Sequence, residues 1–145
     1  MLSRLDNLAA DSSGTTKYAQ YTYLGAGAIA QVQHPAVTNN LVLNYDPSNN
    51  GSFSNLDQFS QVTDQYWQVN SSTVDEYQYG YDYNGNRQYR ANTQSTAKSE
   101  FYTYDALDRV TDRQQGALKG GDTGISGTPA WEQTFTLDEL GNWSG

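Results

Sequence analysis

Acidic and amide side chains at alternate positions can provide oxygen ligands for a cation. Asp82, Asn84 and Asn86 have this spacing, which matches the start of a calcium-binding loop. Such a loop needs glycine and later glutamate, but Arg87 follows instead. The dipeptide Asn84-Gly85 already has a structural explanation as a tight turn. We therefore favour a hairpin turn over a calcium site, and expect neither a metal nor another cofactor.

Two further groups of side chains have chemistry that could serve catalysis. His34 is the only histidine, and no serine or cysteine motif beside it suggests a nucleophile. The neighbouring carboxylates Asp75-Glu76 and Asp138-Glu139 alternate sides in an extended chain, so they cannot act as a pair on one substrate. We expect a surface turn for His34, solvated strand edges for the carboxylates, and no catalytic residues.

Aromatic side chains are the remaining candidates for a binding function. Trp67, Trp131 and Trp143 have polar neighbours, and together with an outward row of tyrosines they could stack on sugars. The chain has only 24 Leu, Ile, Val and Phe residues in 145, but it has 12 tyrosines. With so few aliphatic residues, packing is the favoured role for these rings. A carbohydrate-binding or cell-surface adhesion module is kept as the alternative function.

Charge and composition exclude several classes of partner. The net charge is −8 and the pI is near 4.3, with eight scattered Lys and Arg residues, which argues against nucleic acid or an anionic membrane surface. No cysteine is present, so disulfides and thiolate metal sites are excluded. No apolar run is long enough for a membrane span, and the N-terminal residues contain no export signal. The location of the protein therefore stays unknown from the chain itself.

A repeated unit organises the sequence. An aromatic residue or leucine followed by aspartate recurs at Asp57, Asp82, Asp105 and Asp138, with spacings of 25, 23 and 33 residues. The decamers "LDQFSQVTDQ" and "YDALDRVTDR" share Asp, Val, Thr and Asp at the same positions. This agreement favours a common origin of the units, because a fixed period of this kind is typical of repeat architectures.

The residues before each aspartate predict strands. Residues 79–81, 102–104 and 135–137 alternate in a way that points every second side chain to one face, and residues 21–23 and 41–46 resemble weaker copies. The wide third spacing is explained by a glycine-rich insertion at about 116–130, which we expect to be a long hairpin tip or surface loop. Helix signals are poor throughout.

One unit can be assigned a register. A two-residue type I′ turn at Asn84-Gly85 places Tyr83 opposite Asn86, Asp82 opposite Arg87, Tyr81 opposite Gln88 and Gly80 opposite Tyr89. Asp82 and Arg87 then form a cross-strand pair of opposite charge. Four tyrosines line one face: Tyr77, Tyr79, Tyr81 and Tyr83. Since a two-stranded ribbon is only marginally stable, the unit needs neighbouring hairpins to cover that face.

These residues resemble the YD repeat of the RHS-repeat family. The stretches "YGYDYNGNR", "YTYDALDRV" and "FTLDELGNW" carry the likeness, which covers residues 54–145 well and residues 1–53 weakly, as degenerate copies. In two copies the usual glycine is replaced, by Ser60 and Asp108, and the usual arginine is present only as Arg109. The resemblance implies an all-β fold of tandem antiparallel hairpins that form a curved, open sheet, as part of a larger shell.

The resemblance also implies a function. The shells of such proteins enclose or display a polymorphic C-terminal effector or toxin, or form part of an adhesion receptor. The implied partners are the remainder of the shell or its effector polypeptide, with self-association through sheet edges and glycans as further expectations. A secreted or cell-surface location is implied as well. The short length and the mid-unit start at "SRLDNL" lead us to expect a fragment, and no catalytic residue of the family has a counterpart here.

Overall fold

The computed structural model describes residues 4–10, 13–25, 27–45 and 55–142. The chain separates into two compact units, one formed by Met1–Glu76 and the other by Tyr77–Gly145. The expected boundary between residues 53 and 54 lies outside the described residues. Strands follow one another in the sheet in the order of the chain, from β1 to β10, and they pair in antiparallel fashion.

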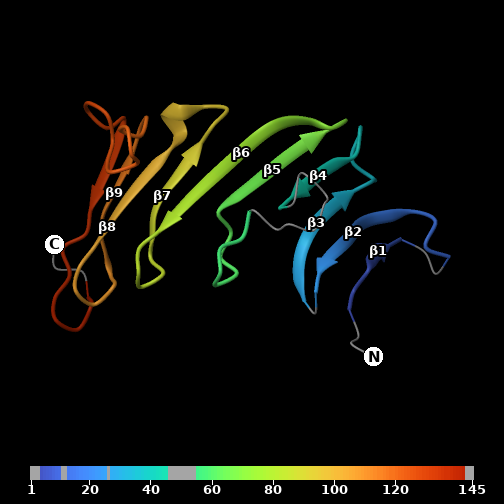
Figure 1. The fold of residues 1–145 in the computed structure, drawn as a ribbon, viewed down its shortest axis with the longest axis horizontal. Helices are drawn as coiled ribbons and strands as arrows, with labels where there is room; N and C mark the ends of the chain where they lie inside the picture. Colours follow the sequence, from blue (N-terminus) through green and yellow to red (C-terminus); the bar gives the residue numbers. More distant parts are fainter. Residues whose placement is uncertain (1–3, 11–12, 26, 46–54, 143–145) are drawn as a thin grey trace. The chain divides into compact units, whose positions relative to one another are not determined.

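The first unit contains five complete strands, shown in blue to green in Figure 1. Each strand pairs with the next one along the chain, and β2–β3 contains a register shift between Thr22 and Tyr23. The strands are β1 (Asn7–Ala9), β2 (Lys17–Leu24), β3 (Ala28–His34), β4 (Leu41–Asn44) and β5 (Asp64–Val69). The weaker strand signals at residues 21–23 and 41–46 therefore correspond to β2 and β4.

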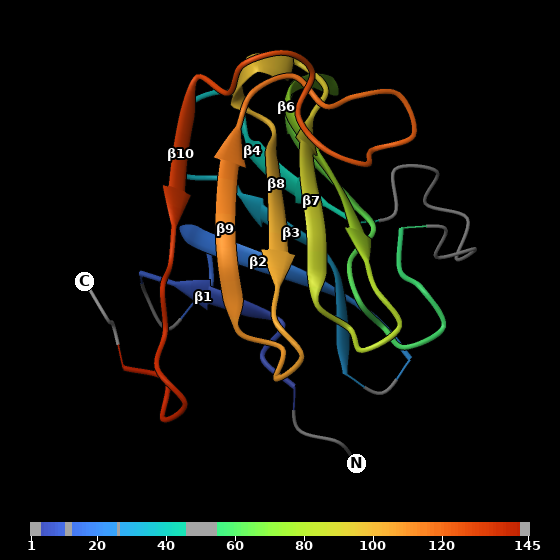
Figure 2. The same cartoon turned by 90° about the vertical axis from the view of Figure 1, so that its left-hand side faces the viewer.

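The second unit continues the same pattern. Strand β6 (Ser72–Tyr81) begins in the first unit, and its second half pairs with β7. The later strands are β7 (Arg87–Asn92), β8 (Glu100–Tyr104), β9 (Val110–Gln115) and β10 (Trp131–Thr134). In Figure 2, β7 to β10 lie side by side, which agrees with their hydrogen-bonded pairing.

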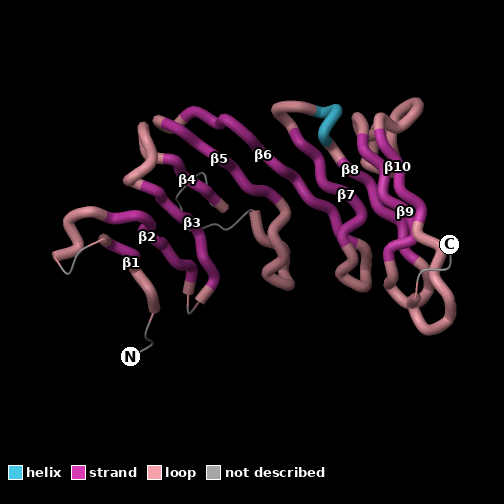
Figure 3. Tube along the Cα trace, turned by 180° about the vertical axis from the view of Figure 1, so that it is seen from behind, coloured by secondary structure: helices cyan, strands magenta, loops and turns pink. Residues whose placement is uncertain are grey.

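The all-β prediction is confirmed. The one helical element in the described part of the chain is a short 3-10 turn, η1 (Thr96–Lys98), which connects β7 to β8 and is drawn in cyan in Figure 3. Two-residue alternation and a high share of tyrosine favour strands, and the lack of capped amphipathic stretches argues against helices in this sequence. Among the described residues, no helix is long and apolar enough to cross a membrane.

The described residues bury very little apolar material. Ala19 and Tyr102 are the only buried hydrophobic side chains, whereas the buried polar residues are Asn44, Asn55, Asn92, Ser99 and Glu100. Most tyrosines are half-buried, and Tyr18 and Tyr83 are exposed. Of the described tyrosines only Tyr102 is buried, so the rings expected to pack are for the most part half covered.

The glycine-rich insertion has a defined conformation. Leu118 forms an isolated bridge with Ile125, and Ser126 N donates to Ala117 O (2.8 Å). Gly116 lies against Ile125, where an added Cβ would be 2.7 Å from the isoleucine Cγ2. The insertion is thus a hairpin-like excursion between β9 and β10, as the sequence predicts.

Candidate functional site

Four turns with the same hydrogen bonds begin at the repeated aspartates. In each turn one carboxylate oxygen accepts the backbone N–H groups two and four residues later, at distances of 2.8–3.0 Å. The aspartate N–H also donates to the carbonyl four residues later, and its own carbonyl accepts from the third residue. The turns begin at Asp57, Asp82, Asp105 and Asp138. An aspartate at the first position of each turn thus forms the same set of hydrogen bonds.

The third residue after each aspartate has a positive φ. The angles are 64° at Ser60, 87° at Gly85, 59° at Asp108 and 85° at Gly141. Glycine adopts this region without strain, whereas serine and aspartate do so at a cost. The carboxylate bonds keep all four turns in one geometry, so the two substitutions at the usual glycine position leave the turn intact.

The expected type I′ turn at Asn84-Gly85 is wrong. Only Gly85 has a positive φ there, while Tyr81 pairs with Arg87 and a register shift follows Gly80. Asp82 N donates to Asn86 O instead of facing Arg87, so the pair Asp82–Arg87, with Tyr81–Gln88 and Tyr83–Asn86, is not formed; Gly80–Tyr89 is confirmed. The reason is local: the Asp82 carboxylate binds two backbone N–H groups, which favours a three-residue loop with a bulge.

A type I′ conformation is present elsewhere. The two residues between β5 and β6, Asn70 and Ser71, both have positive φ, of 50° and 63°. No aspartate carboxylate precedes this turn, so the backbone adopts the common two-residue hairpin geometry. The contrast shows that the aspartate selects the loop type.

Neighbouring turns of the second unit are linked by side chains. Asn84 Nδ2 and Asn86 Nδ2 both donate to Asp108 Oδ1, at 2.9 and 2.7 Å. Arg109 forms an ion pair with Asp105 (2.6 Å) and also donates to the carbonyl of Asp138 (2.8 Å). These bonds hold the three turns side by side at one end of the strands (Figure 1).

Ser60→Gly is expected to stabilise the chain by roughly 0.5–1 kcal/mol, because it removes a positive-φ cost that exceeds the extra chain entropy of glycine. Urea unfolding followed by circular dichroism measures this change. Ser126 is exposed and its φ is not positive, so Ser126→Gly is the matched control and should destabilise. A loss of stability in Ser60→Gly would show that this turn is not held in the conformation described.

Three arginines surround one carboxylate and the tyrosine that donates to it in the second unit. Arg90 and Arg113 form ion pairs with Glu100 Oε1 at 3.0 and 2.5 Å, and Arg87 donates to the hydroxyl of Tyr102 (2.9 Å). The Tyr102 hydroxyl in turn donates to Glu100. We call these five residues the arginine face. They come from β7, β8 and β9, and the register places Arg90 opposite Glu100 and Tyr102 opposite Arg113.

Each arginine of this face also stacks on an aromatic ring. The guanidinium of Arg87 lies 4.8 Å from the ring centroid of Tyr102 and 5.8 Å from that of Tyr79. Arg90 lies over Tyr77 at 5.0 Å and Arg113 over Trp131 at 4.9 Å. Such contacts stabilise partly desolvated cations. In the tyrosine row, Tyr77 and Tyr79 therefore support arginines.

The charges of the face determine how its acids titrate. Burial by itself would raise the pKa of Glu100, but hydrogen bonds from Tyr102 and Arg113 and the charges of Arg90 and Arg113 outweigh it and lower that pKa. Burial and the bond to Glu100 raise the pKa of Tyr102. Glu100 is 2% exposed and remains ionised at neutral pH, and Tyr102 remains protonated as its donor.

The residues that the sequence singled out are not gathered into one site. His34 ends β3, where its carbonyl accepts from Val37 N (3.0 Å). Trp67 is half-buried in β5 opposite Leu43, and Trp131 is 41% exposed beneath Arg113. Trp143 lies outside the described residues. No group of three or more His, Cys, Asp or Glu side chains able to hold a metal occurs in the described ranges.

The carboxylate candidates have structural partners. The Oδ1 atom of Asp75 accepts the Glu76 N–H (3.1 Å). Asp82 and Asp138 form turns, and their second oxygens accept Nδ2 of Asn86 and Asn142, each at 3.1 Å. The two Asp82 oxygens thus accept backbone and amide N–H groups of their own turn.

Sequence reasoning missed the arginine face. Its residues belong to three strands, so only a correct pairing register brings them together. One signal was available: Tyr102 and Glu100 alternate on β8, and Arg113 follows at the corresponding distance across the Asp105 turn. No protein-family model matches this chain, and no curated protein resembles it closely enough to count as a match.

Proposed function

We propose that this chain is a non-enzymatic structural segment, a piece of β-sheet wall built from hairpin repeats that encloses or displays another polypeptide. One observation carries the proposal: four identical aspartate turns organise antiparallel strands whose described residues bury only two apolar side chains. Repeats of this kind bury a continuous surface only by stacking against neighbours.

The small amount of buried apolar surface supports a role as part of a larger assembly. Burial of apolar surface contributes about 25 cal/mol per Å², and it must offset roughly 1–2 kcal/mol of backbone entropy for each ordered residue. Ala19 and Tyr102 supply little of this. Polar networks such as the arginine face specify the arrangement of strands more than they stabilise it. A covering polypeptide would supply the missing burial.

The family resemblance supplies the identity of the partners. By that likeness the neighbours are further repeats of a YD-type shell, and the enclosed polypeptide is a C-terminal effector or toxin. A secreted or cell-surface location follows from the same likeness. The arrangement of strands in sequence order and the four equal turns are consistent with such a repeat.

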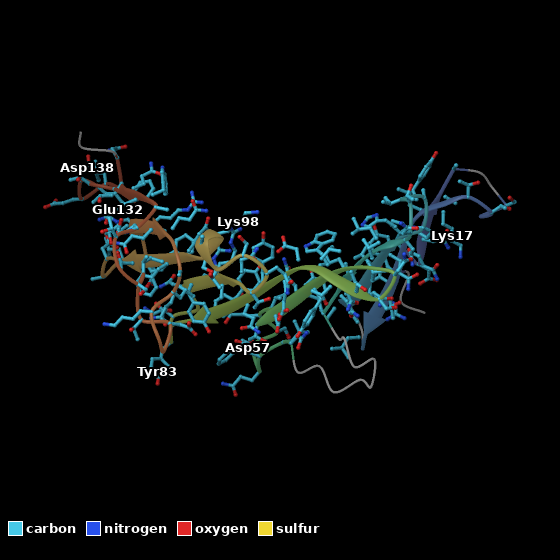
Figure 4. The ribbon with its side chains drawn as sticks, turned by 90° about the horizontal axis from the view of Figure 1, so that it is seen from above. Lys17, Asp57, Tyr83, Lys98, Glu132 and Asp138 are labelled. Carbon is cyan, nitrogen blue, oxygen red and sulfur yellow. The ribbon has the colours of Figure 1, made fainter. Side chains whose placement is uncertain are left out.

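Carbohydrate binding has less support. Sugars stack on open aromatic faces, but guanidinium groups occupy one face of Tyr77, Tyr79, Tyr102 and Trp131. Tyr83 is fully exposed at its turn and points away from the strands in Figure 4. Exposed rings such as Tyr18 and Tyr83 are common on protein surfaces and need no ligand to explain them.

The proposal predicts association through the strand edge at β10. Phe135 N donates to Thr111 O (2.8 Å), and Thr134 lies opposite Asp112. Because hydrogen-bonded and non-bonded pairs alternate, the Thr134 N–H points away from β9 and is available to an added strand. Sedimentation velocity at rising concentration should therefore show oligomers of the parent chain, and Thr134→Pro should reduce them.

Thr134→Ala is the matched control, because it shortens the same side chain but keeps the N–H group. It should associate like the parent. A compact monomer at every concentration would contradict a wall segment, and equal association of Thr134→Pro and Thr134→Ala would contradict this edge as the contact.

A further inference from the structure

We propose that the arginine face binds an acidic polypeptide segment, whose carboxylates neutralise the arginines that Glu100 leaves unpaired. The inference goes beyond the proposed wall function and rests on the second unit alone. Its starting point is a local charge imbalance in a chain whose net charge is −8: Arg90 and Arg113 share the single carboxylate of Glu100, and Arg87 beside them has none.

The imbalance is clearest at Arg87. Its Nη2 donates to the Tyr102 hydroxyl (2.9 Å), and its guanidinium stacks on two tyrosine rings. Within the described residues, no carboxylate forms an ion pair with Arg87. The face contains three guanidinium groups and one carboxylate, so two positive charges have no partner within it. Like charges that lie close together repel one another.

Hydrogen-bonding capacity is also unused. The Nε atoms of Arg87, Arg90 and Arg113 are shielded from water and have no hydrogen-bond partner in the described structure. A partly satisfied polar network is costly, because each desolvated donor loses its water without gaining an acceptor. A small rotation of the guanidinium groups toward an arriving carboxylate would recover part of this cost.

The face is accessible from outside. The side chains of Arg90 and Arg113 are 31% and 40% exposed, whereas that of Glu100 is 3% exposed. Glu100 thus forms a buried anchor, and the outer edges of the guanidinium groups remain open. Arginine, tyrosine and tryptophan are the residues enriched at the hot spots of protein interfaces.

Charge complementarity selects a polypeptide over other anions. The guanidinium fork matches the two oxygens of a carboxylate. A nucleic acid or a long sulfated glycan would extend beyond this patch onto an acidic surface, and repulsion there is screened only over about 8 Å at physiological salt. A short acidic segment can contact the face locally. A glycan would in addition need ring faces that arginines occupy.

Fluorescence anisotropy with a labelled peptide of alternating Glu and Gly tests the proposal, using the full chain. We expect saturable binding that weakens with salt, and no binding of the corresponding Gln-Gly peptide. Arg87→Gln should weaken the affinity about tenfold or more, a change of about 1.4 kcal/mol. Arg87→Lys, which keeps the charge but not the fork, should give an intermediate affinity.

Arg109→Gln is the matched control, because it removes the same charge from an arginine that Asp105 already pairs. It should change the affinity less than about threefold, which is the scale of a screened surface charge. Equal weakening by Arg87→Gln and Arg109→Gln would overturn the proposal in favour of a bulk charge effect. Binding of a heparin-type oligosaccharide or of single-stranded DNA, without binding of the Glu-Gly peptide, would also overturn it.

A second measurement needs no variant. In nuclear magnetic resonance spectra of the parent chain, the Nε–H signals of Arg87, Arg90 and Arg113 should shift together as the Glu-Gly peptide is added, while that of Arg109 stays in place. Unchanged Nε–H signals at a saturating peptide concentration would refute the site, whatever the folding of the variants.

Discussion

Glu100→Ala should lower the free energy of unfolding by about 3–5 kcal/mol, the cost of removing one partner from a buried ion pair. The side chain is 3% exposed and accepts from Arg90, Tyr102 and Arg113. Without it, Arg90, Arg113 and the Tyr102 hydroxyl on neighbouring strands lose their common acceptor. Urea unfolding followed by circular dichroism measures the change.

The matched control is Glu139→Ala, because Glu139 is exposed in the Asp138 turn and has the same charge. It should change stability by no more than about 0.5 kcal/mol, as is usual for surface positions. Glu100→Gln keeps the shape and removes only the charge, so it separates electrostatics from packing. If Glu100→Ala and Glu139→Ala were equally stable, the contacts of Glu100 with the arginine face would contribute nothing measurable to the free energy of unfolding.

The dependence of stability on acid pH provides a second test of the role of Glu100. Its pKa in the folded chain is held below the ordinary value of 4.5, so unfolding favours proton uptake. The stability that it contributes is present above pH 4.5 and is lost as the pH falls through the folded pKa. The stability of Glu100→Gln should therefore decrease less steeply than that of the parent over this acid range. The pKa values of Asp82, Asp105 and Asp138 are also lowered, but these groups are present in both the parent and Glu100→Gln.

Gly80→Ala should destabilise the chain by about 1–3 kcal/mol, as expected for an overpacked contact. An added Cβ at Gly80 would lie 2.1 Å from Cε1 of Tyr89, whose ring crosses the glycine on the neighbouring strand. The ring covers the backbone where glycine provides no side chain, an arrangement known to support glycines in sheets. Thermal unfolding compares the variant with the parent.

A double-mutant cycle makes this contact measurable. Tyr89→Ala should cost less in the Gly80→Ala background than in the parent, because the clash is then absent. Gly120→Ala is the control: nothing lies within 4 Å of its added Cβ, and its φ is not positive. Additive effects of Gly80→Ala and Tyr89→Ala would show that the ring does not lie over the glycine.

Local chemistry made part of the strands predictable. The alternating residues 79–81 and 102–104 end β6 and β8 directly before Asp82 and Asp105, whereas residues 135–137 lie beyond β10, which ends at Thr134. The loop type was mispredicted, because Asn84-Gly85 is a strong hairpin signal on its own. The fourth residue after each aspartate is an amide or arginine in all four copies, and this pattern indicates a carboxylate-centred turn.

The arginine face could not be predicted in the same way. Arg87, Glu100 and Arg113 are 13 residues apart in each step, and they meet only if both hairpins have the right register. The register predicted from Asn84-Gly85 is right at Gly80–Tyr89 and wrong only toward the turn, where a bulge shifts the pairing by one residue. The pairing of β8 with β7 and with β9, which forms the arginine face, depends on other connections, to which the sequence assigns no register.

The aspartate turns also bear on how the polypeptide matures. Every contact that defines such a turn lies within five consecutive residues, so a hairpin can close in about 1–10 μs. Ribosomes add only about 5–20 residues per second. Each hairpin therefore has time to sample its final shape before the next one is synthesised, and it can serve as a template on which the following strand aligns. A chain of such hairpins can lengthen by duplication of its coding segment, because every new copy contains the aspartate that forms its own turn.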